Sequence, residues 1–320
     1  MRRSPMSQAK STVGKYADPK TLDRIKRLDV RARCVVEGFI TGQHRSPFNG
    51  FAIEFAAHRE YAPGDDLRHI DWKVWSKTDR LYIKEYEEET NLSCHILVDC
   101  SKSMEYGSQS EEGWSKFDYA ATAAASLAYM MQQQQDSVGL VLFSNKIDKV
   151  LKASTHPSHM KLIFHELEET KPNNVTDIAD PFLQLAGQIR SRGMVCLFSD
   201  LFLDPQELLR SLEQFRIRRH EVVVFHVMHH DELEFPFEEN TLFRGMEVDA
   251  ELHTEPRALR DSYLEAVSEY MKKIKSVCAG AGIDHVLLDT SKPLDGVLTC
   301  LLYTSPSPRD LSTSRMPSSA

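Results

Sequence analysis

The stretch CHILVDCSKSM, from Cys94 to Met104, decides the fold class of this chain. A run of apolar, strand-favouring residues ends in Asp99, and Ser101 and Ser103 follow at every second position. Buried strands of parallel sheets have such continuous apolar runs, and open α/β sheets bind ligands beyond the carboxyl ends of their strands. The stretch therefore predicts a buried strand that leads into a polar loop, which could form a catalytic centre, a metal site or only a turn.

Strand-like and helix-like segments alternate after this stretch, which is typical of a mostly parallel sheet covered by helices. We expect strands at 95–99, 136–144, 194–200, 221–228 and 284–290. We expect helices at 116–135, 159–170, 177–193, 204–220 and 257–282. Asp204 and Pro205 have the pattern of a helix start, and Gly193 that of a helix end. The predicted fold class is α/β, doubly wound, with helices on both faces of the sheet.

The first ninety residues differ in character. A charged helix is predicted at 20–33, and short alternating runs around a Pro63–Gly64 turn predict a small β-containing segment. We therefore expect an N-terminal segment at 1–91 and the α/β domain at 92–299. Residues 1–33 carry ten Lys and Arg against three Asp; such an arm is either solvated or contacts an acidic partner or membrane surface weakly.

Residues 300–320 have no apolar periodicity and resemble the translation of a sequencing adapter. We exclude them from the fold prediction, and expect the natural sequence to continue differently after about Thr299. The other interpretation is a natural Ser/Pro-rich tail.

Composition excludes several classes of protein. A formal net charge of −8 argues against nucleic-acid binding, and no apolar run reaches the roughly 18 residues of a membrane span. No P-loop, G-x-S-x-G or G-x-G-x-x-G motif is present. The cysteines before residue 300 form no close pairs, which predicts a reducing, cytoplasmic location. These are Cys34, Cys94, Cys100, Cys196 and Cys278.

We call the segment after the first predicted strand, residues 100–104, the first loop. Oxygen-bearing side chains recur at later predicted loops and strand ends that can lie beside it. Thr176 and Asp177 precede a predicted helix, and Asp200 closes a predicted strand after Ser199. Carboxylates and hydroxyls are hard ligands that suit magnesium or manganese. The sequence therefore favours a cation site that includes Asp99.

These three loops resemble the metal-ion-dependent adhesion site of a von Willebrand factor type A domain. REYAPGDDLRHIDW, from Arg59 to Trp72, and the following KTDRLYIKEYEEE resemble the signature of the domain of unknown function 58 family. The resemblance, over roughly 30–299, implies a von Willebrand A-like fold and a docking role beside a MoxR-type AAA+ ATPase. It also implies that an acidic residue of a partner or client protein completes the coordination of the ion. The implied ion ligands are Asp99, Ser101, Ser103, Thr176 and Asp200.

Each of these motifs has a simpler interpretation as well. Asp-x-Ser-x-Ser can be a turn whose side chains cap backbone groups, and an inward Lys102 would oppose cation binding. The upstream signature, with Trp72 and Trp75 as anchors, can simply attach the N-terminal segment.

Three further histidines lie near one predicted strand end and could bind a metal, although packing roles are commoner for such residues. They are His226, His229 and His230.

Two functions follow from the sequence. The first is a non-catalytic adaptor that docks an acidic partner residue through magnesium. The alternative is a magnesium-dependent phosphotransfer or phosphatase-like enzyme that uses Asp99. Ser101 stands where a phosphatase would have a second acidic residue, which favours the adaptor.

Overall fold

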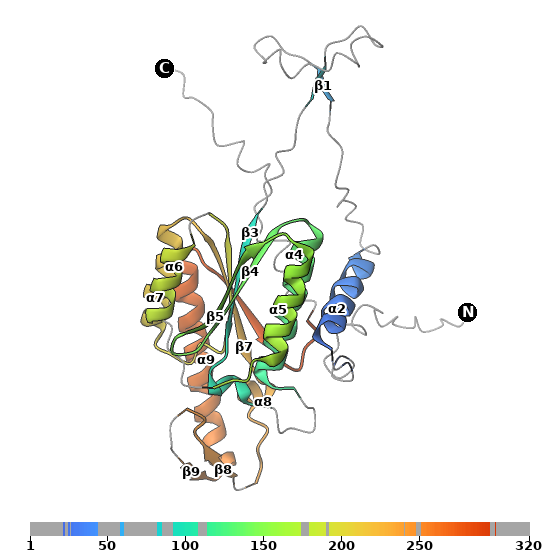
Figure 1. The fold of residues 1–320 in the computed structure, drawn as a ribbon. Coiled ribbons are helices and arrows are strands. Elements are labelled where there is room, and N and C mark those ends of the chain that lie inside the picture. The colour runs from blue at the N-terminus through green and yellow to red at the C-terminus, as the bar shows by residue number, and fades with distance from the viewer. Residues whose placement is uncertain are drawn as a thin grey trace, which may run out of the picture. The chain divides into compact units, whose positions relative to one another are not determined.

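A computed structural model describes the backbone of residues 22, 25, 27–43, 58–60, 82–84, 92–107, 114–173, 179–189, 192–239, 241–247, 251–294 and 298. The described residues fall into two compact units, one with residues 27–42 and the residues from 92 onward, and one with residues 58–60 and 82–84. The first unit holds an α/β fold (Figure 1).

The first unit is built on a six-stranded sheet in the order β10-β7-β6-β3-β4-β5. All neighbouring strands are parallel except β4 and β5, which are antiparallel. The strands are β3 Ser93–Asp99, β4 Ser137–Phe143, β5 Ile147–Ser154, β6 Met194–Ser199, β7 Glu221–Met228 and β10 Asp284–Asp289. The chain builds outward from β3 to β5 and then returns to the other side of β3. The strand order therefore reverses between β3 and β6, where open α/β sheets form their ligand crevice.

Helices cover both faces of the sheet, as predicted. One face carries α2, α4 and α5, and the other carries α6, α7 and α9 (Figure 1). Each face of the sheet has its own hydrophobic core, the first under α2, α4 and α5 and the second under α6, α7 and α9. Alternate residues of β3 point to opposite faces, so Ile96 and Val98 lie in the first core and Leu97 lies in the second. The helices are α2 Leu28–Gln43, α4 Lys116–Gln133, α5 Pro157–Glu169, α6 Ala179–Gln188, α7 Pro205–Ile217, α8 His230–Glu234 and α9 Pro256–Gly280. The predicted α/β, mostly parallel, doubly wound fold is confirmed.

Smaller elements lie at the end of the sheet where the parallel strands finish, which we call the carboxyl edge. They are the 3-10 helix η3 Lys102–Glu105, the helix α8, and a hairpin of β8 Thr241–Arg244 and β9 Glu251–Thr254 (Figure 1). In the second unit, β1 His58–Glu60 and β2 Tyr82–Lys84 form an antiparallel pair. The predicted Pro63–Gly64 turn, Trp72 and Trp75 lie outside the described residues, as do residues 300–320.

Two helices differ most from the prediction. The helix α2 spans 28–43, so it shares residues 28–33 with the predicted helix and continues beyond it, because its apolar residues at helical spacing, among them Leu28 and Val35, pack into the first core. The α6 helix ends at Gln188 and not at Gly193. Gly193 instead approaches β3 so closely that an added Cβ would lie 2.1 Å from the backbone oxygen of Ser93, and only glycine fits there.

Other local predictions hold. Asp204 caps α7 by accepting hydrogen bonds from the backbone N–H groups of Gln206 and Glu207, with Pro205 at the first helical position. The five described cysteines are free thiols. Among the helices that the structure describes, none combines the length and apolar character that a bilayer crossing requires.

Candidate functional site

Asp99 ends the central strand β3 and is fully buried at the carboxyl edge. Both of its carboxylate oxygens are hydrogen-bonded. The Ser199 hydroxyl donates to Oδ2 at 2.6 Å, and the backbone N–H of Ser101 donates to Oδ1 at 2.9 Å. Because Ser199 ends the neighbouring strand β6, the two central strands meet at this carboxylate. Asp99 is therefore held in one orientation by both strands.

The two serines of the first loop turn toward each other. Ser101 is buried, and its Oγ lies 3.0 Å from Oγ of Ser103. Ser101 is also the residue that precedes η3, but its side chain caps no backbone group of that helix. The Ser101 hydroxyl therefore does not cap η3, whereas Asp99 does accept a hydrogen bond from a backbone N–H, as the turn interpretation predicts.

Asp200 follows β6 directly and lies beside the first loop. It is 2% exposed, and the Lys116 ammonium donates to its Oδ2 at 2.7 Å. No hydrogen bond reaches its buried Oδ1 from the residues that the structure describes. The Ser103 hydroxyl nevertheless lies close enough to help lower the pKa of Asp200. We call Asp99, Ser101, Ser103 and Asp200 the candidate site.

The two carboxyl groups of the candidate site influence each other. Burial raises the pKa of Asp99 above its usual value, and the nearby charge of Asp200 raises it further. Burial would also raise the pKa of Asp200, but the ion pair with Lys116 outweighs it and the pKa is lowered. The site thus holds Asp200 charged and makes ionisation of Asp99 less favourable.

Lys116 lies beside the candidate site, and the sequence analysis missed it. It opens α4, and its side chain is 2% exposed. Its ammonium also donates to Oε1 of Glu232 in α8 at 2.9 Å. Lysine in the first turn of a helix opposes the helix dipole, and that position was the sequence signal that could have identified it.

Lys102, which the sequence suggested as a threat to cation binding, is exposed. The buried cation beside the site is Lys116 instead. Thr176, the fifth predicted ligand, lies outside the described residues together with Asp177.

The three histidines do not come together as a metal cluster. His226 is buried, with Nε2 3.0 Å from the backbone oxygen of Asp200 and Nδ1 3.3 Å from His285. His229 caps α8 and His230 pairs with Glu234. Within the described ranges, no three His, Cys, Asp or Glu side chains are grouped as a metal site. Packing and capping therefore account for these histidines.

A second strand-end aspartate shows what the Asp-x-Ser pattern does alone. Asp289 ends β10, and its Oδ1 accepts a hydrogen bond from the backbone N–H of Ser291 at 2.9 Å. This repeats the Asp99–Ser101 turn. Asp289 pairs with Lys292, which is exposed, rather than with a buried lysine. The same turn thus follows two strands of this sheet, and the hydrogen bond from Ser199 of β6 distinguishes Asp99.

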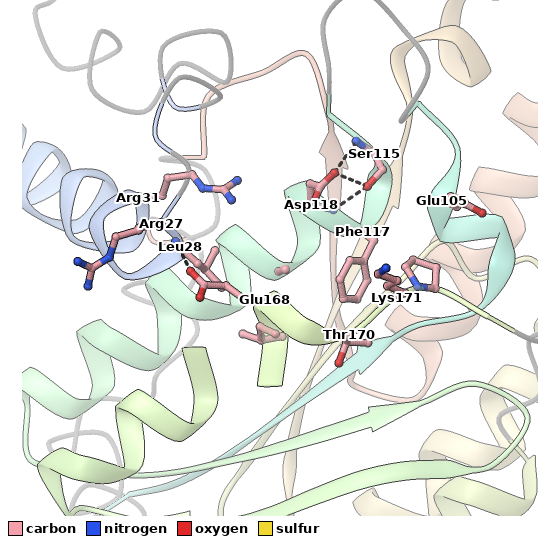
Figure 2. A pocket seen from close by; sticks show the side chains of 13 residues that line it. Arg27, Leu28, Arg31, Glu105, Ser115, Phe117, Asp118, Glu168, Thr170 and Lys171 are labelled. Carbon is pink, nitrogen blue, oxygen red and sulfur yellow. Dashed lines mark hydrogen bonds between the residues drawn. The ribbon is translucent and has the colours of Figure 1, made fainter. Parts of the chain in front are cut away.

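A cavity of about 530 Å³ lies between the start of α2, the start of α4 and the end of α5 (Figure 2). Two of its carboxylates are already partnered: Glu168 accepts a hydrogen bond from the backbone N–H of Leu28 at 2.6 Å, and Asp118 forms the capping box of α4 with Ser115. The cavity marks the junction where α2 joins the sheet domain.

A family model matches more than half of the chain. The model described as "Protein of unknown function DUF58" matches residues 57–273. The chain is 26% identical over 284 residues to the uncharacterized protein Rv1480 of Mycobacterium tuberculosis (strain ATCC 25618 / H37Rv), which covers 87% of this chain and 88% of that protein.

Solved structures show weaker likeness. BatB from Bacteroides thetaiotaomicron is 12% identical with a TM-score of 0.41, covering 67% of this chain and all of BatB. The SpRpn10 VWA domain is 13% identical with a TM-score of 0.38, covering 65% of this chain and 94% of that domain. At these scores the fold description rests on the sheet order and not on the likeness.

Proposed function

Because the chain belongs to the DUF58 family, we propose that its von Willebrand A-like domain is a non-catalytic adaptor that docks an acidic partner residue through a magnesium ion. A MoxR-type AAA+ ATPase is the proposed working partner, and the bound acidic residue belongs to that ATPase or to its client. The observation that carries the proposal is the convergence of the candidate site at the point where the strand order reverses.

The donor chemistry of the candidate site fits a hard divalent cation. Two carboxylates and two hydroxyls lie together, and Oδ1 of Asp200 is a buried oxygen without a hydrogen bond among the described residues. Magnesium and manganese prefer such oxygen ligands. Asp99, Ser101, Ser103 and Asp200 would hold the ion or its waters, with Thr176 as a further proposed ligand. A bound cation would supply positive charge for an incoming carboxylate.

The alternative, an enzyme with Asp99 as nucleophile, gains no support from the geometry. Asp99 is fully buried, and each of its oxygens already accepts a hydrogen bond. Attack on a substrate needs an accessible oxygen, which the fully buried Asp99 lacks, whereas each of its oxygens keeps a lone pair for a ligand. The observed arrangement supports an orienting or ligating role.

A binding experiment tests the adaptor function. The full chain, immobilised, is incubated with a purified MoxR-type AAA+ ATPase, with magnesium or with EDTA. We expect binding that EDTA abolishes and magnesium restores, and Asp99→Asn should lose it under both conditions. Asp289→Asn, which changes the equivalent turn after β10, should retain binding. Binding that is insensitive to EDTA and to Asp99→Asn would contradict the proposal.

A further inference from the structure

Lys116 occupies a position that is unfavourable unless carboxylates stabilise it. Its ammonium is buried, at the helix end where the backbone dipole opposes a positive charge. Removing a charge from water costs several kcal/mol unless partners compensate. Two carboxylates do so here, Asp200 at 2.7 Å and Glu232 at 2.9 Å.

The two oxygens of Asp200 are in different situations. Lys116 holds Oδ2, while Oδ1 is buried without a hydrogen bond from the described residues. We propose that Lys116 is the resident counter-ion of the candidate site and sets its affinity for a divalent cation by competing for Asp200. The inference rests on the proposed function, because it concerns the same site.

Glu232 makes the exchange feasible. One of its oxygens binds Lys116, and the other accepts a hydrogen bond from the backbone N–H of His229 at 2.8 Å, which completes the capping box of α8. Glu232 is thus fixed in place independently of Asp200. When a divalent cation takes over Asp200, Lys116 keeps a carboxylate partner and is not left as an isolated buried charge.

Calorimetric titration of the full, EDTA-treated chain with manganese or magnesium chloride tests this competition. Lys116→Met should bind the cation at least about tenfold more tightly than the wild type, because the competing ammonium is gone. Glu232→Gln should have the opposite effect, because Lys116 then depends on Asp200 alone.

Glu166→Gln is a matched control for Glu232→Gln. It breaks the ion pair with Lys149 at 2.8 Å, in which the lysine side chain is 47% exposed. Cation affinity should not change in this variant. A second readout is thermal unfolding: Lys116→Met should unfold at a lower temperature than wild type in EDTA, and magnesium should raise that temperature more in the variant than in the wild type.

The outcomes separate the two claims. If the wild type binds one cation that Asp99→Asn abolishes, while Lys116→Met binds no more tightly, the competition is refuted and the proposed function stands. If neither the wild type nor Lys116→Met binds a cation, both are refuted. If Lys116→Met does not fold, Glu232→Gln still tests the competition. A cation affinity of Glu232→Gln that equals or exceeds the wild-type affinity refutes it.

Discussion

Ser199→Ala should destabilise the protein by more than the loss of an ordinary buried hydroxyl. The Ser199 hydroxyl donates to Oδ2 of Asp99 at 2.6 Å and accepts from the backbone N–H of Leu201 at 3.0 Å, and all three groups are buried. An ordinary intramolecular hydrogen bond contributes about 0.5–1.5 kcal/mol, and a buried N–H left unpaired costs about 1–3 kcal/mol. Since the two effects overlap, we expect a loss of about 2 kcal/mol.

Urea denaturation followed by circular dichroism measures this loss as a shift in the transition midpoint. Ser126→Ala is the matched control. Ser126 is equally buried, but its hydroxyl makes a single hydrogen bond, to the backbone oxygen of Thr122 within α4 at 2.7 Å. Alanine is also the better helix former, so the control should change stability by less than about 1 kcal/mol. Equal effects of the two substitutions would refute the role given to Ser199.

Three further predictions concern the fold. Burial, and then the charge of a neighbouring histidine, lowers the pKa of His95 from 6.5 to about 4. Because the unfolded chain then binds the proton more readily, the free energy of unfolding falls as the pH drops below 6.5. His95→Gln should reduce the loss of unfolding free energy between pH 7.5 and 5 by about 2 kcal/mol in urea titrations. Gly193→Ala should destabilise by at least about 2 kcal/mol in the same assay, whereas Gly187→Ala, whose added Cβ meets no atom within 4 Å, should not. Val35→Ala should lower the free energy of unfolding by about 2 kcal/mol because the Val35 side chain is fully buried. Val30 is more exposed, so Val30→Ala should lower it by less than about 0.5 kcal/mol. Similar losses in the two variants would contradict the packing of α2.

The buried strands were predictable because their sequences are nearly uniform in character. Residues 194–199 and 221–228 are almost continuous apolar runs, which are typical of strands buried on both faces. The edge strand β5 was missed because it lies half in solvent, and its sequence IDKVLKAS mixes polar and apolar residues. Helix ends were less predictable, since tertiary packing decides where α2 and α6 stop.

The candidate site was predictable only in part. Strand-end position and oxygen chemistry were enough to bring Asp99, Ser101, Ser103 and Asp200 together. The buried ion pair was not predictable, because Lys116 and Asp200 are 84 residues apart and meet only when α4 packs across the ends of β3 and β6. Long-range pairs of this kind leave no spacing pattern in the sequence.

Direct cation binding tests the central claim. Manganese binding to the EDTA-treated full chain, followed by calorimetry, should give one ion per chain in the wild type. Asp99→Asn should abolish this binding, and Asp289→Asn should leave it unchanged. Unchanged binding in Asp99→Asn, or no binding in either the wild type or Lys116→Met, would contradict the account.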